Sequence, residues 1–221
     1  MTTDIQKLEK DGFVVIKNFA SCYKIELNET DLPLKNVRFC LNKIPSLKKS
    51  AEIISNFLKS WYNALYFNRS IYFNKNKSND WNVLWHQDLT LAVKEKFDHP
   101  EFGPWSIKEK IDHVQPPIEL LRNMVTARFH FNRCDHSNGA LKVIPGSHNK
   151  IFTREEIESL DKSSVHTCEA DAGDLLLLKP LVLHSSESLL DKEKSRSILH
   201  LEFLTRKPPD FLKLYHSQNI L

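Results

Sequence analysis

The stretch from Val83 to Val93, VLWHQDLTLAV, places a histidine and an aspartate in an otherwise apolar run. Side chains alternate along a β-strand, so His86 and Asp88 would face one side and Gln87 the other. One imidazole nitrogen and one carboxylate oxygen at the same point supply two of the three ligands of a non-haem iron(II) site. A lone His-x-Asp pair arises easily by chance in a chain with ten histidines, so the pair permits a metal site without establishing one.

A third ligand has to come from another segment, and His184 ends the apolar run DLLLLKPLVLH. We expect it at the end of a strand, on the rim of a cavity. Arg196 stands twelve residues later, at the start of the apolar strand SILHLEFL. A tight antiparallel return would bring Arg196 beside the strand of His184. A buried guanidinium needs an anion and is shaped to clamp a carboxylate, so it indicates either an anionic ligand or a structural ion pair with Asp or Glu.

The strand from Asn123 to Asn132 has two unlike faces. One face is apolar, with Val125, Ala127, Phe129 and Phe131; the other carries Met124, Thr126, Arg128, His130 and Asn132. In an open sheet the polar face would meet solvent, whereas inside a barrel it would line the site. The sequence leaves both alternatives open.

Short strands separated by turns dominate the chain from Asn68 onward. Before them come a short helix, the β-branched strand Phe13–Ile16, and an amphipathic helix over Ser50 to Tyr62. Thr153 with Glu156 three residues later is typical of a capping box that begins another helix. The pattern predicts a mainly β fold with flanking helices, in which a sandwich or barrel has helices packed on one sheet.

The chain of 221 residues is long enough for one domain with a sizeable core, and we expect one over residues 1–221. Within it, residues 1–67 form an N-terminal region of helix and strand. Residues 94–119, with prolines near both ends, interrupt the strand pattern. An insertion of this length is often a lid or a binding loop, and Trp105 is a candidate to contact substrate there.

Charge and cysteine usage exclude several classes of protein. The net charge of +3 comes from Lys and Arg dispersed among Asp and Glu, so no nucleic-acid partner is indicated. The four cysteines stand far apart without a CxxC pair, which favours reduced thiols in a cytoplasmic protein. No apolar run reaches the ~18 residues that span a bilayer, and no membrane partner is expected.

Four ordered motifs resemble one known family: WHQDLTLAV, NGALKVIPGSH from Asn138 to His148, GDLLLLKPLVLHSS and RSILHLEF. The sequence is similar to the phytanoyl-CoA dioxygenase family of oxygenases that depend on iron(II) and 2-oxoglutarate. The similarity also covers SIYFNKNKSNDWNVLWHQD and FGPWSIKEKIDHVQPP, and it is weakest over residues 2–49. The resemblance implies a double-stranded β-helix core, which is a jelly-roll of cupin-like form.

The resemblance also implies roles for individual residues. His86, Asp88 and His184 match the family's iron ligands and would be catalytic, while Arg196 matches the arginine that pairs with the distal carboxylate of 2-oxoglutarate. Ser186 matches a position that contacts the same carboxylate, although it could be a simple turn serine. Arg128 stands where some members carry a tryptophan beside the cosubstrate, and it could bind the other carboxylate of the cosubstrate or an acidic substrate.

The implied activity is hydroxylation of a small molecule, with iron(II), 2-oxoglutarate and O2 as cofactor and cosubstrates and with succinate and carbon dioxide as products. Halogenating relatives replace the metal-binding carboxylate, and here Asp88 is intact. His130, Thr90 and Lys75 are further candidates for the substrate pocket. Two alternatives remain: a metal-binding jelly-roll module without oxygenase activity, and a zinc hydrolase that uses the same three ligands.

Overall fold

Antiparallel strands build most of the computed structural model, which describes residues 3–215. The largest sheet has six strands in the order β1-β11-β8-β13-β3-β2. Their bounds are β1 (Phe13–Ile16), β2 (Val37–Arg38), β3 (Tyr66–Lys75), β8 (Met124–His130), β11 (Leu175–Leu178) and β13 (Arg196–Leu204). Strand β13 lies at the centre and pairs over most of its length with both β3 and β8.

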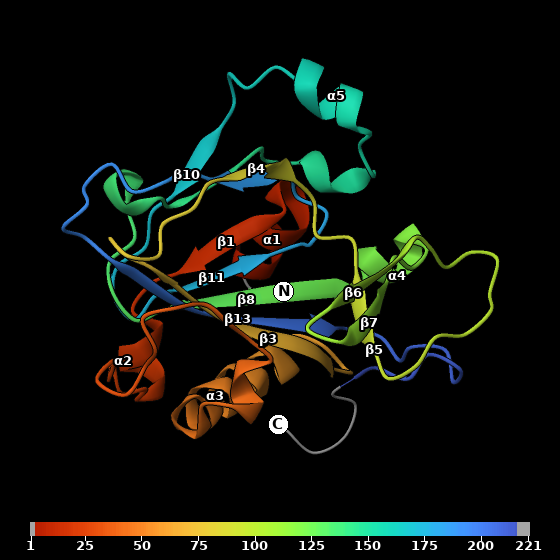
Figure 1. Ribbon diagram of the computed structural model, residues 1–221, viewed down its shortest axis with the longest axis horizontal. Helices are drawn as coiled ribbons and strands as arrows, with labels where there is room; N and C mark the ends of the chain where they lie inside the picture. The colour runs from red at the N-terminus through yellow and green to blue at the C-terminus, as the bar shows by residue number, and fades with distance from the viewer. Residues whose placement is uncertain (1–2, 216–221) are drawn as a thin grey trace.

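A second sheet of four strands faces the large one and lies above it in Figure 1. Its order is β10-β9-β12-β4, with bounds β10 (His166–Cys168), β9 (Leu141–Val143), β12 (His184–Ser186) and β4 (Val83–His86). At one end an apolar cluster joins the two sheets, in which Leu176 and Leu178 of β11 meet Leu141 and Val143 of β9. Because this end is filled with side chains, any cavity between the sheets must lie towards the other end.

The segment 94–119 contributes to a third, three-stranded sheet of order β5-β7-β6. Strands β6 (Trp105–Lys108) and β7 (Ile111–Val114) form a hairpin that pairs with β5 (Leu91–Val93), and α4 (Ile118–Arg122) follows. Its apolar side packs against Leu204 at the end of β13 and against Leu212. The segment is therefore a packed hairpin instead of an irregular loop, and its action as a lid stays a prediction.

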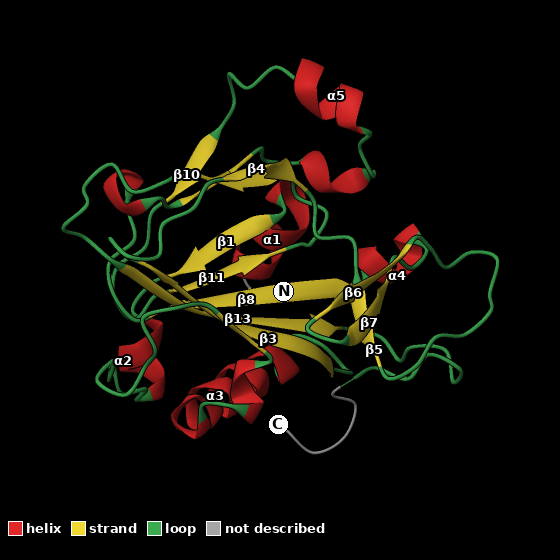
Figure 2. Cartoon of the chain, in the orientation of Figure 1, coloured by secondary structure: helices red, strands yellow, loops and turns green. Residues whose placement is uncertain are grey.

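Two helices, α2 (Phe19–Tyr23) and α3 (Lys48–Lys59), cover the outer face of the six-stranded sheet, whereas α5 (Arg154–Ser159) lies beyond the four-stranded sheet (Figure 2). The other helix bounds are α1 (Thr3–Asp11) and the short 3-10 turns η1 (Cys40–Asn42), η2 (Pro45–Leu47), η3 (His136–Asn138) and η4 (Ser147–Asn149). Ile54 and Leu58 of α3 pack in one cluster with the alternate residues Val125, Ala127 and Phe129 of β8. This packing confirms the predicted amphipathic helix and the prediction of helices on one sheet.

The capping box predicted at Thr153 is present at the start of α5: the Thr153 hydroxyl accepts from the Glu156 N–H, and the Glu156 carboxylate accepts from the Thr153 N–H. None of the helices within residues 3–215 is both long and apolar enough to cross a membrane. All four cysteines are free thiols.

The prediction that Val83 to Val93 form a single strand was wrong, because β4 ends at His86 and β5 begins at Leu91 in a different sheet. His184 likewise begins β12 instead of ending a strand, since β11 stops at Leu178. Pro180 lies in the break, where it lacks the N–H that a continued ladder needs. The Asp88 N–H instead donates to the Pro180 carbonyl at 2.9 Å. This hydrogen bond joins the segment between β4 and β5 to the segment between β11 and β12.

Gln87 faces away from Asp88 and is almost buried, with 8% of its surface exposed. Its amide nitrogen donates to the Leu181 carbonyl and, at 2.8 Å, to the Lys150 carbonyl. Its amide oxygen accepts from the Phe152 N–H at 2.9 Å. The side chain therefore replaces the backbone pairing that is lost where the chain changes sheets.

Replacing Gln87 by Ala should lower the free energy of unfolding by about 2–3 kcal/mol, because two carbonyls and one N–H lose their partner in a buried place. Urea denaturation of the metal-free protein measures this change. Gln6→Ala, on the exposed face of α1, is the matched control and should shift stability by less than about 0.5 kcal/mol. An equal effect of the two substitutions would contradict the role given to Gln87.

Candidate metal centre

His86, Asp88 and His184 converge between the sheets. Strands β4 and β12 pair with His184 directly opposite His86, and the ring centroids lie 4.2 Å apart. The Asp88 Oδ2 atom lies 3.6 Å from His184 Nε2. One ligand atom from each residue lies within 4.8 Å of the others, so two segments distant in the sequence present a compact donor set.

Backbone carbonyls fix the orientation of both imidazole rings. His86 Nδ1 lies 2.8 Å from the Leu84 carbonyl oxygen, and His184 Nδ1 lies 2.8 Å from the Val182 carbonyl oxygen. A carbonyl only accepts, so each Nδ1 carries the hydrogen and each Nε2 keeps its lone pair. Two such nitrogens and one carboxylate oxygen form the set that non-haem iron(II) takes, and the residues fit that ion.

The charge states of the donors suit a divalent cation. Burial tends to raise the pKa of Asp88, yet neighbouring His184 and Arg69 hold the pKa well below its usual range, so the group is a carboxylate. Arg69 Nη2 lies 4.0 Å from Asp88 Oδ1. Burial lowers the pKa of His184 to about 4, and its ring is therefore neutral at neutral pH.

A buried chain of polar groups extends behind Asp88 on the inner face of the large sheet. Arg69 Nε donates to Glu202 at 2.7 Å, and His200 Nε2 lies 2.9 Å from the same carboxylate oxygen. His200 Nδ1 is 3.1 Å from an Arg128 nitrogen. Our sequence reasoning missed Arg69, His200 and Glu202. Their signal is a period of two: His200 and Glu202 follow Arg196 at even spacing along one apolar strand.

Arg196 reaches the cavity from the sheet opposite β12. We had expected its strand to lie beside that of His184; instead β13 pairs with β3 and β8, while β12 pairs with β4 and β9. The Arg196 Nη1 atom donates to the Gly139 carbonyl and to Ser186 Oγ, the latter at 3.2 Å. The side chain therefore bridges the two sheets at the position of Ser186.

The Arg196 side chain is buried, with 2% of its surface exposed, and its Nε has no hydrogen-bond partner. No Asp or Glu within residues 3–215 forms an ion pair with it. The sequence left two alternatives for this guanidinium, an anionic ligand or a structural ion pair. The described residues provide no such ion pair. An arginine left in this state favours an anionic ligand.

Arg128 lies on the inward face of β8, which is buried along its length and is not turned to solvent. Its guanidinium carbon is 5.6 Å from the centroid of the Phe73 ring, and its Nε has no partner among the described residues. Burial and the charge of Arg196 lower the pKa of Arg128 to about 10, which leaves it cationic at neutral pH. Two arginines thus approach one cavity from adjacent strands.

The cavity has a volume of 450 Å³, which lies within the range of small-molecule sites. It is lined by the three metal-ligand candidates and Arg128, Ser186 and Arg196, and further by Asn36, Arg38, Arg69, Ile71, Phe73, Trp81, Val83, Lys108, Leu141, Ser185 and His200. The candidate iron ligands and cosubstrate residues therefore share one space.

Four residues that the sequence suggested for the substrate pocket lie outside this lining set. Trp105 packs on Phe97, with 5.2 Å between the ring centroids, and His130 is buried near the Asp174 carbonyl. Thr90 accepts from Lys108 at 3.4 Å. Lys75 donates to Ser186 Oγ and to the Trp81 and Glu187 carbonyls. These contacts use all three of its N–H donors outside the cavity lining. Their contact with substrate stays a prediction.

Two facing antiparallel sheets around a cluster of two histidines and one carboxylate define a jelly-roll protein with a candidate metal centre. Residues 45–190, more than half of the chain, match the family described as phytanoyl-CoA dioxygenase. The chain therefore belongs to the phytanoyl-CoA dioxygenase family. No curated protein matches the sequence significantly.

Solved structures show the same fold. HygX from Streptomyces hygroscopicus, with iron bound, is 16% identical with a TM-score of 0.63, over 97% of this chain and 90% of HygX. SnoN, a non-haem α-ketoglutarate-dependent epimerase from nogalamycin biosynthesis, is 12% identical with a TM-score of 0.61, over 91% and 81%. EctD from S. alaskensis, in its apo form, is 16% identical with a TM-score of 0.60, over 96% and 84%. These likenesses confirm the predicted jelly-roll fold.

The buried histidines should make the metal-free protein sensitive to acid. Burial, with Arg128 nearby, lowers the pKa of His130 to about 3 from the ordinary 6.5. As the pH falls from 6.5 to 4, His130 takes up a proton in the unfolded chain but stays neutral in the folded protein. The free energy of unfolding therefore falls by about 1.4 kcal/mol per pH unit for this residue. His130→Gln should make the slope shallower by up to that amount in urea titrations with a chelator present.

His166→Gln is the matched control for this prediction, because the side chain of His166 is exposed on β10. It should leave the dependence of unfolding free energy on pH as in the wild type. A slope that is the same in the wild type and in His130→Gln would show that His130 is not held neutral by its surroundings.

Proposed function

We propose that the protein is an iron(II)- and 2-oxoglutarate-dependent dioxygenase that hydroxylates an unidentified small molecule and releases succinate and carbon dioxide. The observation that carries the proposal is the pairing of two features in one cavity. Three donors converge, with Nδ1 of both histidines bonded to a carbonyl so that Nε2 is left to bind a metal, and Arg196 is buried without an acidic partner. A bound metal ion would account for the convergent donors, and a carboxylate ligand would pair with Arg196.

His86, Asp88 and His184 would hold the iron. Iron(II) bound in this way supplies, together with 2-oxoglutarate and O2, the oxidising chemistry that replaces a C–H hydrogen by hydroxyl. The Leu84 and Val182 carbonyls keep the two rings in the ligand tautomer. Arg69 holds the carboxylate of Asp88 and is itself held by Glu202.

Arg196 and Ser186 would bind the distal carboxylate of 2-oxoglutarate, since both lie at the same wall and Arg196 keeps a free Nε. We assign Arg128 to the cosubstrate as well, because it faces the same cavity beside Arg196. Ile71, Phe73 and Leu141 supply apolar surface that excludes water from the reacting groups. Structures of HygX contain nickel with 2-oxoglutarate and hygromycin B, which supports a small-molecule substrate here.

Arg196 also separates this proposal from the two alternatives. A structural metal site would use the three ligands and leave a buried guanidinium without an anion, and a zinc hydrolase would do the same unless its substrate were anionic. The intact Asp88 distinguishes the chain from relatives that halogenate. Hydroxylation is therefore the activity that we propose.

Anaerobic addition of iron(II) and then 2-oxoglutarate should produce the visible charge-transfer absorption of a chelated 2-oxo acid. Asp88→Ala should abolish the band and weaken iron binding by more than about 100-fold, since even losing an outer-shell partner costs 10–100-fold. Asp98→Ala, at an exposed position of the 94–119 segment, is the matched control and should keep the band. Visible spectroscopy and metal titration give both readouts.

A folded, iron-loaded wild-type protein that develops no band with 2-oxoglutarate would overturn the proposed function. Under air, succinate release should depend on 2-oxoglutarate and fall to background in Asp88→Ala. Succinate release equal to that of the wild type in this variant would show that the carboxylate is not a ligand.

A further inference from the structure

The cavity wall carries more positive charge than the proposed chemistry needs. Five cationic side chains line it, and Asp88 is the single carboxylate among the lining residues described. The five cationic residues are Arg38, Arg69, Lys108, Arg128 and Arg196. Arg196 and Arg128 are assigned to the cosubstrate, and Arg69 serves Asp88 and Glu202. Arg38 and Lys108 are left without an assigned anion.

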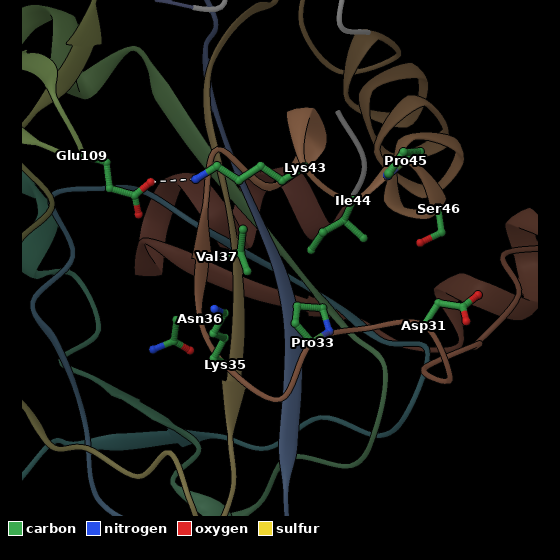
Figure 3. Close-up of a pocket in the computed structure, with 10 residues that line it drawn as sticks. All are labelled: Asp31, Pro33, Lys35, Asn36, Val37, Lys43, Ile44, Pro45, Ser46 and Glu109. Carbon is green, nitrogen blue, oxygen red and sulfur yellow. Dashed lines mark hydrogen bonds and ion pairs between the residues drawn. The ribbon is translucent and has the colours of Figure 1, made fainter.

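Arg38 and Lys108 come from segments that are 70 residues apart in the sequence, and the fold brings them to one rim. Arg38 ends β2 and pairs opposite Ile71 of β3, whereas Lys108 ends β6. Glu109, next to Lys108, forms an ion pair of 2.8 Å with Lys43 in the segment after β2 (Figure 3). This contact fastens the tip of the β6–β7 hairpin beside the end of β2.

Neither cation makes an ion pair with an acid within the described residues, although Glu109, Glu202 and Asp88 lie near enough to act on Arg38. The Arg38 side chain makes no hydrogen bond within residues 3–215, and the single side-chain hydrogen bond of Lys108 is the 3.4 Å contact with Thr90. Arg69 Nη1, at the same rim, is buried without a partner. Burial and the repulsion of Arg69 and Arg38 lower the pKa of Lys108, and burial and Arg69 lower that of Arg38.

This cluster lies at the opposite end of the cavity from the cosubstrate arginine. Arg196 pairs opposite Lys75 on β3, whereas Arg38 pairs opposite Ile71 and Glu202 pairs opposite Arg69. Lys75 is four positions from Ile71 and six from Arg69, which corresponds to about 13 Å and about 20 Å of strand at about 3.3 Å per residue. Of the candidate metal ligands, Asp88 lies 4.0 Å from Arg69, and His184 is two residues from Ser186, which accepts from Arg196. A molecule held at the rim would therefore be presented to the metal from the side away from Arg196.

We propose that Arg38 and Lys108 form an anion subsite that binds a carboxylate or phosphate group of the substrate. The proposal rests on the proposed function and narrows its substrate to a small organic anion that fits beside the cosubstrate in 450 Å³. A guanidinium can donate two parallel hydrogen bonds to such a group, and an ammonium adds a third. The β6–β7 hairpin thereby carries a substrate-binding side chain, which gives the predicted lid a chemical role.

The test uses protein loaded anaerobically with iron(II) and 2-oxoglutarate, so that the cosubstrate end is filled. Inorganic sulfate, a tetrahedral dianion like a phosphate monoester, and acetate are titrated separately by calorimetry at constant ionic strength. At least one should bind saturably to the wild type. Arg38→Gln and Lys108→Gln should each weaken that binding about tenfold or more, since a charge-assisted hydrogen bond is lost. Arg38→Lys should keep part of it.

Arg206→Gln and Lys94→Gln are the matched controls, because each removes one exposed positive charge outside the cavity lining. Both should bind the probe as the wild type does. Preference for sulfate or for acetate then assigns the substrate group as phosphate or carboxylate.

The subsite would be refuted if the wild type bound neither probe, or if Arg38→Gln and Lys108→Gln bound both as tightly as the controls. The charge-transfer band reports on the proposed function independently in the same samples. If the band is absent while anion binding still depends on Arg38 and Lys108, the dioxygenase assignment fails and the subsite stands. If every variant shows the band and anion binding is unchanged in Arg38→Gln and Lys108→Gln, the subsite fails and the dioxygenase assignment stands.

Discussion

The carboxylate of Asp88 has to balance the positive charge that gathers between the two sheets. It lies between His184, at 3.6 Å, and the guanidinium of Arg69, at 4.0 Å, in a space where Arg128 and Arg196 add further charge. Because an unpaired buried charge is costly, this arrangement is stable only if other anions or hydrogen bonds complete it. Glu202 completes part of it within the protein, by its pair with Arg69. The remaining positive charge, on Arg128 and Arg196, would be balanced by bound anionic ligands.

Strand β13 joins the core to this site. Leu199, Leu201 and Phe203 turn to the helices, whereas His200 and Glu202 turn to the cavity. The same pleat that gives the protein its largest apolar cluster therefore fixes the buried polar chain behind Asp88. A change of register by one residue would exchange the two faces, so the packing of α2 and α3 holds the site residues in place.

Sequence patterns predicted the parts of the fold and the site that depend on local spacing. The amphipathic helix over 50–62, the capping box at Thr153 and the alternation of β8 are all properties of neighbouring residues. The ordered motifs, read through their family resemblance, named the three residues that converge. The switch of sheet between His86 and Leu91 escaped, because an apolar run looks the same whether it stays in one sheet or crosses to another. The proximity of Arg38 to Lys108 was not predicted, because only tertiary packing brings these residues together.

Diffraction at the iron absorption edge from anaerobic crystals grown with iron(II) and 2-oxoglutarate tests the central claim most directly. The account predicts one anomalous peak bonded to His86 Nε2, His184 Nε2 and the Asp88 carboxylate, with the distal carboxylate of 2-oxoglutarate on Arg196. An iron peak elsewhere, or a 2-oxoglutarate carboxylate held away from Arg196, would contradict it.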